Sequence, residues 1–341
     1  MAKILVTGGA GYIGSHVTRQ LLAAGHEAVV FDSLENGHKE ALPEGIDFFQ
    51  GNILDFESIK KALKNVDAVL HFAAYIEAGE SMQNPLRFFE NNLKGSATLL
   101  EAMRQSKVNK IVFSSTAAIY GEPQYTPIDE EHPKNPTNIY GLTKLQVEKT
   151  LDFYDRMFDF RYAALRYFNA AGADESGQIG EDHDPETHLI PLILKAALGQ
   201  RENIKIFGTD YPTKDGTCIR DYIHIKDLGT AHIMVLEKLL NGSGSMQYNL
   251  GNGKGYSVRE VIETAKKVTG KTIDVIETEK REGDSAVLVA SSEKAKKELG
   301  WQPKHKGITQ IIKTAWKWHE SHPEGFAASK KSHSISDSKI I

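Results

Sequence analysis

The sequence has little cysteine and no excess of basic residues. Cys218 is the only cysteine among 341 residues, so the chain cannot form an intrachain disulfide or a metal site from several thiolates. The formal net charge of −4 gives no electrostatic reason to expect nucleic acid or an anionic membrane as a partner. We therefore predict no nucleic-acid partner, no membrane partner and no metal site.

Long hydrophobic runs are also absent. The longest apolar stretches have only several residues, too few to cross a bilayer. Residues 1–6 lead directly into a strand-like segment, without the layout of a signal peptide. The sequence therefore predicts a cytoplasmic protein.

A glycine-rich stretch follows the first predicted strand. Residues 3–7 form a short apolar, β-branched run that is typical of a strand buried on both faces. Gly8 to Gly14 then lead into an amphipathic helix predicted over residues 15–24. Small glycines let the backbone approach a pyrophosphate, whose charge the helix N-terminus stabilises. A strand, a glycine turn and a helix in this order predict a dinucleotide site rather than a merely structural turn.

An acidic residue ends the second predicted strand. Asp32 follows the strand at 28–31 and lies 18 residues beyond Gly14. A carboxylate at about that distance accepts hydrogen bonds from the adenosine ribose hydroxyls and repels a 2′-phosphate. This spacing favours NAD over NADP as the cofactor.

Strands and helices alternate through the first half of the chain. Such alternation predicts parallel pairing with right-handed crossovers, that is, an α/β fold with a Rossmann-type doubly wound parallel sheet. Ligands bind at the carboxyl ends of the strands in such sheets. The further strands are predicted at 47–53, 67–74 and 110–113, the helices at 56–63 and 85–105, and the strand-end residues in the groove are Gly11, Asp32, Phe72, Ala73 and Ser114 to Thr116.

The length and a composition of 40% hydrophobic and 25% charged residues predict two globular domains. We expect an NAD-binding domain over residues 1–170, to which a segment at about 217–250 returns, beginning with residues 220–224. A smaller C-terminal α/β substrate domain is expected over residues 171–326, and 327–341 are expected to be a disordered tail. The later helices are predicted at 189–198, 227–240 and 256–268, and the later strands at 204–207, 248–250 and 273–276.

A tyrosine and a lysine stand four residues apart in a helix predicted over residues 140–156. Tyr140 and Lys144 then share one helix face, so we expect the ammonium beside the phenol, where it favours the ionised form. Lowering a tyrosine pKa from about 10 to about 7 needs roughly 4 kcal/mol, which one lysine and a second cation could supply. A lone pair with this spacing is usually an ordinary exposed tyrosine and lysine, so its role depends on the other motifs.

Six parts of the sequence carry a family resemblance: Thr7 to His16, Tyr140 to Lys144, Leu165 to Asn169, Ile206 to Gly208 with Asp210 to Thr213, Arg220 to His224, and Arg281 to Asp284. Together they resemble the extended short-chain dehydrogenase/reductase superfamily and, within it, the UDP-glucose 4-epimerase family. The first two are shared across the superfamily, whereas the other four are more specific to the epimerases. The resemblance spans about residues 3–320.

The resemblance implies reversible C4 epimerisation of UDP-glucose and UDP-galactose, by transient hydride transfer to tightly bound NAD through a 4-keto intermediate. Tyr140, with Lys144 beside it, would remove the proton of the sugar 4-hydroxyl as general base. Thr116 would hydrogen-bond the same oxygen, and the positively charged nicotinamide would be the second cation near the tyrosine. The family also commonly forms homodimers through two helices of each subunit, which here would be those at 85–105 and 140–156.

The resemblance also implies the binding residues. Arginine suits the UDP pyrophosphate because its planar fork can bind phosphate oxygens bidentately. The cofactor residues would be Gly8, Gly11, Tyr12, Ile13, Gly14, Asp32, Asn36, Asn52, Ile53, Phe72, Ala73, Asn91, Ser114, Tyr140, Lys144 and Phe168. The UDP-sugar residues would be Thr116, Asn169, Leu189, Phe207, Arg220, Arg281, Asp284 and Leu288.

Four positions depart from patterns in the family. Thr116 stands where serine is frequent and keeps the hydroxyl, and Asn52 stands where many members have an aspartate that meets the adenine. Ile76 stands where some members have a lysine that contacts the cofactor. Leu288 stands where members limited to hexoses can carry a tyrosine, so we hypothesise further activity on UDP-GlcNAc and UDP-GalNAc.

Three other functions stay open at this point. A nucleotide-sugar 4,6-dehydratase needs an added acid and base directly after Thr116, where this chain has Ala117 and Ala118. A UDP-pentose or UDP-uronate epimerase or decarboxylase is harder to exclude, because the sugar pocket is not legible from the sequence. A non-catalytic nucleotide-binding regulator on the same fold would be expected to lose Tyr140 or Lys144.

Overall fold

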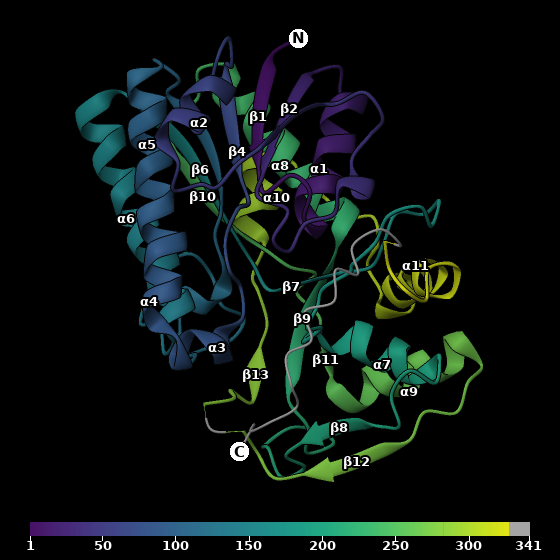
Figure 1. The fold of residues 1–341 in the computed structure, drawn as a ribbon. Helices are drawn as coiled ribbons and strands as arrows, with labels where there is room; N and C mark the ends of the chain where they lie inside the picture. The colour runs from purple at the N-terminus through teal and green to yellow at the C-terminus, as the bar shows by residue number, and fades with distance from the viewer. Residues whose placement is uncertain (282, 327–341) are drawn as a thin grey trace.

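The computed structural model describes residues 1–281 and 283–326. A large sheet with helices on both faces adjoins a second region of smaller sheets and helices (Figure 1). The tail predicted over residues 327–341 lies outside the described residues. In the part of the chain that the structure describes, no helix is long and apolar enough to cross a membrane.

Seven parallel strands form the large sheet, in the order β10-β6-β5-β4-β1-β2-β3. The predicted doubly wound sheet is therefore confirmed. The strand order reverses at β1, between β4 and β2, and a reversal of this kind opens a crevice at the carboxyl ends of the strands. The strands are β1 (Lys3–Thr7), β2 (Glu27–Asp32), β3 (Asp47–Gln50), β4 (Ala68–His71), β5 (Lys110–Ser114), β6 (Arg161–Tyr167) and β10 (Met246–Leu250).

Helices cover both faces of this sheet because the strand side chains alternate between two cores. Ile4 and Val6 of β1 lie in one core with α1, α8 and α10. Leu5, which lies between them, belongs to the other core with α2, α5 and α6. Burial on both faces explains why these strands are almost uniformly apolar. The helices are α1 (Tyr12–Ala23), α2 (Phe56–Ala62), α5 (Gly95–Gln105), α6 (Ile139–Phe158), α8 (Ile225–Leu240) and α10 (Glu293–Leu299).

The helix predicted over residues 85–105 is present but not uniform. It consists of α4 (Pro85–Phe88), a π-helical segment (Phe89–Lys94) and α5. Asn92 in the π-helical segment holds the backbone of Tyr75, after β4, through two hydrogen bonds of 2.9 Å. The segment thus positions the chain at the edge of the crevice. Three short helices complete this part: η1 (Lys39–Ala41), α3 (Ala78–Gln83) and η3 (Ala117–Ile119).

The second region contains two small sheets around a third core. One sheet consists of β7 (Asn169–Ala171), β9 (Ile219–His224), β11 (Gly255–Ser257) and β13 (Val287–Leu288), and the other of β8 (Ile204–Phe207) and β12 (Val275–Thr278). The helices α7 (Leu189–Ala197), α9 (Val258–Thr269) and α11 (Ile308–Ser321) supply most of that core. The division into two domains at residue 170 stays a prediction.

Two predicted elements differ from the structure here. Residues 220–224 lie in β9, which pairs with β7, β11 and β13, so within the returning segment predicted at 217–250 only α8 and β10 lie in or against the large sheet. The strand β9 mixes polar and apolar residues, and this pattern does not specify which sheet it joins. The helix predicted from Tyr256 begins at Val258 instead, because Ser257 and Glu260 form a capping box after β11.

Candidate active site

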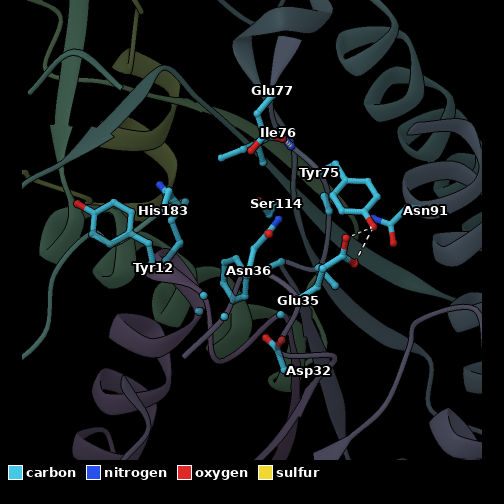
Figure 2. A pocket seen from close by; sticks show the side chains of 18 of the residues that line it. Tyr12, Asp32, Glu35, Asn36, Tyr75, Ile76, Glu77, Asn91, Ser114 and His183 are labelled. Atoms are coloured by element: carbon cyan, nitrogen blue, oxygen red, sulfur yellow. Dashed lines mark hydrogen bonds between the residues drawn. The ribbon is translucent and has the colours of Figure 1, made fainter. Parts of the chain in front are cut away.

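A cavity opens at the carboxyl ends of the parallel strands, where the strand order reverses. Figure 2 shows Asp32 and Glu35 on one wall, Tyr75 and Asn91 on a second, and Tyr12 with His183 on a third. Every cofactor residue predicted from the sequence lines this cavity: Gly8, Gly11, Tyr12, Ile13, Gly14, Asp32, Asn36, Asn52, Ile53, Phe72, Ala73, Asn91, Ser114, Tyr140, Lys144 and Phe168.

The glycine loop, Gly8 to Gly14, packs so tightly that its backbone leaves no room for a side chain at Gly8 or Gly14. A Cβ on Gly8 would lie 2.5 Å from the backbone nitrogen of Ala73, and a Cβ on Gly14 would overlap the carbonyl oxygen of Gly8. Gly8 also has a φ of +71°, which side-chain-bearing residues rarely adopt. Gly11 is the N-cap of α1 and brings no side-chain cap. The helix therefore presents free backbone N–H groups, which suit a pyrophosphate.

Asp32 is the last residue of β2 and lies beside the glycine loop. Its carboxylate accepts hydrogen bonds from the backbone nitrogens of Ala10, at 2.9 Å, and Leu34, at 2.8 Å. Burial raises the pKa of Asp32, and these two hydrogen bonds act in the opposite direction. The carboxylate is thus held in place at the cavity wall, where a ribose hydroxyl could donate to it.

Tyr140 lies in the first turn of α6, close to the end of β5. Asn138 caps the helix by accepting from the backbone nitrogen of Gly141 at 2.8 Å. A Cβ on Gly141 would lie 2.5 Å from the carbonyl oxygen of Ala118, so only glycine permits this approach of α6 to the chain after β5. Burial raises the pKa of Tyr140 to about 12, while a hydrogen bond with Thr116 acts to lower it.

Lys144 projects from the same helix face as Tyr140, and the expectation that its ammonium favours the ionised phenol stays a prediction. Its Nζ lies 5.9 Å from the Tyr140 ring centroid and donates to the Ser114 carbonyl oxygen at 2.8 Å. Burial lowers the pKa of Lys144 to about 7. Helical spacing places the two residues on one face, and the hydrogen bond to the Ser114 carbonyl holds the ammonium at the end of β5.

A buried ion pair holds α6 against the sheet behind these residues. Arg166 of β6 donates to Glu148 of α6 through Nε at 2.9 Å and Nη2 at 2.7 Å, and the two side chains are 0% and 3% exposed. Ser115 donates to the same carboxylate at 2.5 Å. Ser115 precedes Thr116, so the network fixes the helix that carries Tyr140 relative to the strand end that carries Thr116. The sequence analysis missed it, although a charged residue inside an apolar strand is a visible signal.

The predicted UDP-sugar residues fall into two groups. Thr116 and Asn169 line the cavity, but Leu189, Phe207, Arg220, Arg281, Asp284 and Leu288 do not. Four of these others form what we call the arginine cluster: Phe207, Arg220, Arg281 and Asp284. Asp284 lies 3.6 Å from Arg220 and 3.8 Å from Arg281, and the Arg281 guanidinium lies 3.8 Å above the Phe207 ring. The structure thus brings these four together from β8, β9 and the loop before β13.

A side-chain clasp crosses the edge of the cavity and was also missed. The Tyr75 hydroxyl, after β4, lies 2.8 and 2.7 Å from the two carboxylate oxygens of Glu35, after β2 (Figure 2). Arg87 of α4 stacks on the Tyr75 ring at 3.9 Å and pairs with Glu35 at 3.0 Å. Ile76 lines the cavity next to this clasp. It stands where some family members have a lysine that contacts the cofactor. No single spacing in the sequence links the three clasp residues.

Glu181, His183 and His188 also line the cavity, and His183 lies on the wall that includes Tyr12 (Figure 2). None of these three residues was predicted from the sequence as a site residue. Together with Glu186 they give two glutamates and two histidines in alternation within eight residues. This pattern was the signal in the sequence that could have indicated a site here.

The chain is similar to known proteins along most of its length. Residues 4–251 match the NAD dependent epimerase/dehydratase family. A UDP-glucose 4-epimerase of Lacticaseibacillus casei is 50% identical over 325 residues, which are 95% of this chain and 98% of that protein. A crystal structure of a UDP-glucose 4-epimerase has 50% identity and a TM-score of 0.93, covering 95% of this chain and 99% of that one. Another from Brucella ovis, in complex with NAD, has 42% identity and a TM-score of 0.90, covering 93% and 98%.

Proposed function

The chain belongs to the NAD dependent epimerase/dehydratase family, and we propose that it catalyses the reversible C4 epimerisation of UDP-glucose and UDP-galactose with bound NAD. The observation that carries this function is that Tyr140, Thr116 and Lys144 line the same cavity as the glycine loop. A dinucleotide site and a candidate general base are therefore within one ligand length of each other.

The residues that line the cavity offer the hydrogen-bonding groups that NAD requires. The glycine loop offers backbone N–H groups to a pyrophosphate, and Asp32 offers a fixed carboxylate to the adenosine ribose. Lys144 uses one of its three N–H donors on the Ser114 carbonyl, so two remain for the other ribose. When bound, NAD supplies the acceptor and donor of the C4 hydride.

Tyr140 is the residue placed to take the proton of the sugar 4-hydroxyl. In the protein alone its pKa of about 12 keeps the phenol protonated at neutral pH, so it becomes a base only when the filled cleft favours the phenolate. Thr116 already acts in that direction through its hydrogen bond, and its single hydroxyl proton could turn to the developing sugar alkoxide instead. Lys144 ties α6 to the end of β5 and thereby holds Tyr140 and Thr116 in register.

The residues after Thr116 support an epimerase over a 4,6-dehydratase. Ala117 and Ala118 begin η3 directly beyond the Thr116 cap, and neither side chain can move the protons that an elimination requires.

The range of sugars is a further proposal. Leu288 packs against a cluster with Ile119, Ile128 and Leu145, and a side chain smaller than tyrosine at this position could leave room for an N-acetyl group. Turnover of UDP-GlcNAc and UDP-GalNAc is the measurement, and no rate on either would exclude this extension.

We also propose a homodimer and a cytoplasmic location. Leu86 of α4 and Phe153 and Met157 of α6 are 68%, 60% and 68% exposed, and their helices lie on the same outer edge of the molecule (Figure 1). An apolar surface of this kind suits a two-helix contact that a second copy would complete to four helices. Light scattering of the purified protein measures the mass, and a monomer at micromolar concentration would exclude the dimer.

The experiment for the reaction is to add UDP-galactose to purified protein without supplying NAD. Formation of UDP-glucose is expected, because NAD is regenerated in every cycle and stays bound. Tyr140→Phe is expected to lose about 10²- to 10⁴-fold in kcat, the usual contribution of a general base, while it keeps its NAD. Tyr154→Phe, on the same helix, is the matched control and should retain activity.

The outcomes separate the alternatives. Unaltered kcat in Tyr140→Phe would refute the proposed role of Tyr140 as the general base. No conversion by wild-type protein that contains NAD would instead move the assignment to a UDP-pentose or UDP-uronate substrate.

A further inference from the structure

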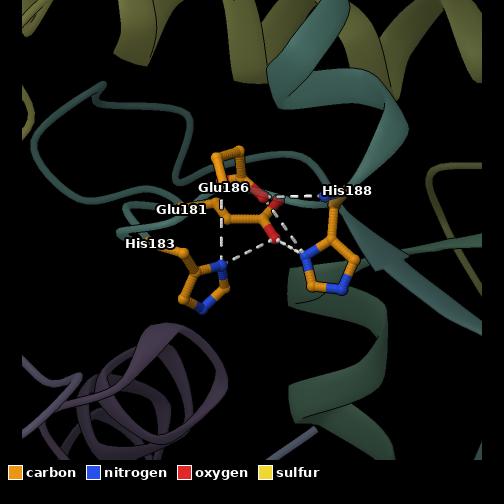
Figure 3. A group of neighbouring side chains, drawn as sticks. All are labelled: Glu181, His183, Glu186 and His188. Atoms are coloured by element: carbon orange, nitrogen blue, oxygen red, sulfur yellow. Dashed lines mark hydrogen bonds and ion pairs between the residues drawn. The ribbon is translucent and has the colours of Figure 1, made fainter. Parts of the chain in front are cut away.

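Two glutamates and two histidines converge in the loop between β7 and α7. Figure 3 shows the side chains of Glu181, His183, Glu186 and His188 directed at a common centre. We call these four residues the loop quartet. Each offers one ligand atom, and the four atoms all lie within 4.8 Å of one another. In the part of the chain that the structure describes, no other group of histidine, cysteine, aspartate and glutamate meets this condition.

Three nitrogen–oxygen separations within the loop quartet are close to those of a tetrahedral metal site. His183 Nδ1 lies 3.4 Å from Glu181 Oε1 and 3.7 Å from Glu186 Oε2, and His188 Nδ1 lies 3.6 Å from Glu186 Oε1. Zinc bonds to nitrogen and oxygen of about 2.0–2.2 Å give tetrahedral ligand separations of about 3.4 Å. Only the 2.6 Å between His188 Nδ1 and Glu181 Oε1 is shorter, and a small movement of one ring would open it.

Ion pairing alone leaves the loop quartet incompletely satisfied. The Glu181 and Glu186 side chains are 5% and 2% exposed, so both carboxylates are removed from water and need compensation. Each histidine faces both carboxylates through the same atom, Nδ1, and a single N–H cannot point well at two oxygens. Glu186 Oε2 is buried without a hydrogen bond, and the closest contact of His188 Nδ1 is Glu181 Oε1 at 2.6 Å. One cation at the common centre would serve all four atoms at once.

We propose that Glu181, His183, Glu186 and His188 bind a divalent transition-metal ion, for which Zn²⁺ is the best match. Two imidazole nitrogens favour zinc-like ions over Mg²⁺ or Ca²⁺, which prefer oxygen ligands. With neutral histidines, one divalent cation balances the two buried carboxylates. Four protein ligands leave no open position, which is the pattern of a structural rather than a catalytic zinc site. From the sequence we predicted no metal site, and this proposal departs from that prediction.

The metal would stiffen one wall of the cofactor cavity. The backbone carbonyl of Glu181 accepts from Trp318 of α11 at 3.1 Å, so one end of the loop is already anchored. The His183 ring meets the Tyr12 ring edge to face at 6.4 Å, and Tyr12 belongs to the glycine loop. Leu189, at the start of α7, follows the last ligand directly. The metal therefore fixes the loop between the glycine loop and α7 and takes no part in the chemistry at C4.

The first test is the metal content and affinity of the NAD-loaded protein. After dialysis against a chelator, titration calorimetry with Zn²⁺ should give one site per chain, and Co²⁺ in its place should give the visible bands of tetrahedral coordination. His183→Gln and Glu186→Gln should bind Zn²⁺ at least about 100-fold more weakly, since each loses one of four ligands. His26→Gln, which changes a histidine outside the loop, is the matched control and should bind as wild type.

A second measurement separates metal binding from misfolding. Excess Zn²⁺ should raise the Tm of the wild type and of His26→Gln, because a ligand of the folded state stabilises it, and should leave the Tm of Glu186→Gln unchanged. NAD content checks that each variant is folded. No Zn²⁺ binding by the wild type, or equal affinity in Glu186→Gln, would overturn the proposal. Neither readout uses epimerase activity, so the result is independent of the proposed function.

Discussion

The glycine loop and the arginine cluster were both predicted from motifs, but they are built in different ways. The glycine loop is seven consecutive residues whose backbone contacts exclude side chains at Gly8 and Gly14. The arginine cluster joins three separate segments through ion pairs at 3.6 and 3.8 Å, and Arg281 is 63% exposed. The first is fixed by local sterics before any ligand binds. The second is held by weak surface pairs and can rearrange around a substrate.

The largest expected effect comes from breaking the steric fit of the glycine loop. In Gly14→Ala the new methyl would overlap the Gly8 carbonyl and press on the Gly9 Cα, and backbone cannot move aside as a flexible side chain can. We expect a cost at or above the roughly 1–3 kcal/mol typical of overpacking and loss of bound NAD. Cofactor content and Tm are the measurements.

The control for that substitution is Gly79→Ala. Gly79 lies in α3 without a positive φ, and no atom lies within 4 Å of the position that the alanine methyl would occupy. This variant should keep NAD and gain slightly in stability. Normal NAD content in Gly14→Ala would show that the loop adapts, and the contrast with the arginine cluster would then disappear.

A smaller effect, confined to substrate, is expected from the arginine cluster. Arg220→Leu removes a cation beside Asp284 that could bind the UDP pyrophosphate. A hydrogen bond to a charged group contributes about 1.5–3 kcal/mol, so we expect KM for the UDP-sugar to rise about 10- to 100-fold. NAD content and kcat should change little, because Arg220 does not line the cofactor cavity.

Arg259→Leu is the matched control in the same region. Its guanidinium pairs with Glu277 at 2.7 Å, outside the arginine cluster, and both side chains are exposed. KM should stay near the wild-type value in this variant. An equal KM in Arg220→Leu and Arg259→Leu would remove Arg220 from the substrate site.

The same contrast explains what the sequence could predict. The cofactor wall followed from one steric motif and from the rule that ligands bind at strand ends, so Gly8, Asp32 and Ser114 could be placed together. The hydrogen bond of Lys144 to Ser114 could not be predicted, because it depends on how closely α6 approaches β5. The pairing of β9 could not be predicted either, because a short strand of mixed polar and apolar residues does not specify which sheet it joins.

The loop quartet shows the other limit of a sequence prediction. Glu181, His183, Glu186 and His188 lie in an irregular loop, where no helical or strand period says which side chains face one another. Their convergence depends on the backbone path between β7 and α7 and on the anchor to Trp318. Spacing alone therefore identifies candidate ligands here but cannot place them around one centre.

The smallest expected effect comes from the clasp of Tyr75, Glu35 and Arg87. It tests whether side chains at the edge of the cavity help the glycine loop to retain NAD. Tyr75→Phe removes the hydrogen bonds between the β4 and β2 sides of the cavity but keeps the ring on which Arg87 stacks. Because Glu35 is 47% exposed, we expect a loss of about 1 kcal/mol and an NAD dissociation rate about 5-fold faster. Tyr125→Phe loses a similar bond, to Asp129 at 2.8 Å, away from the cavity and should release NAD at the wild-type rate. If both variants release NAD alike, the clasp does not hold the cofactor, and the backbone of the glycine loop carries retention without it.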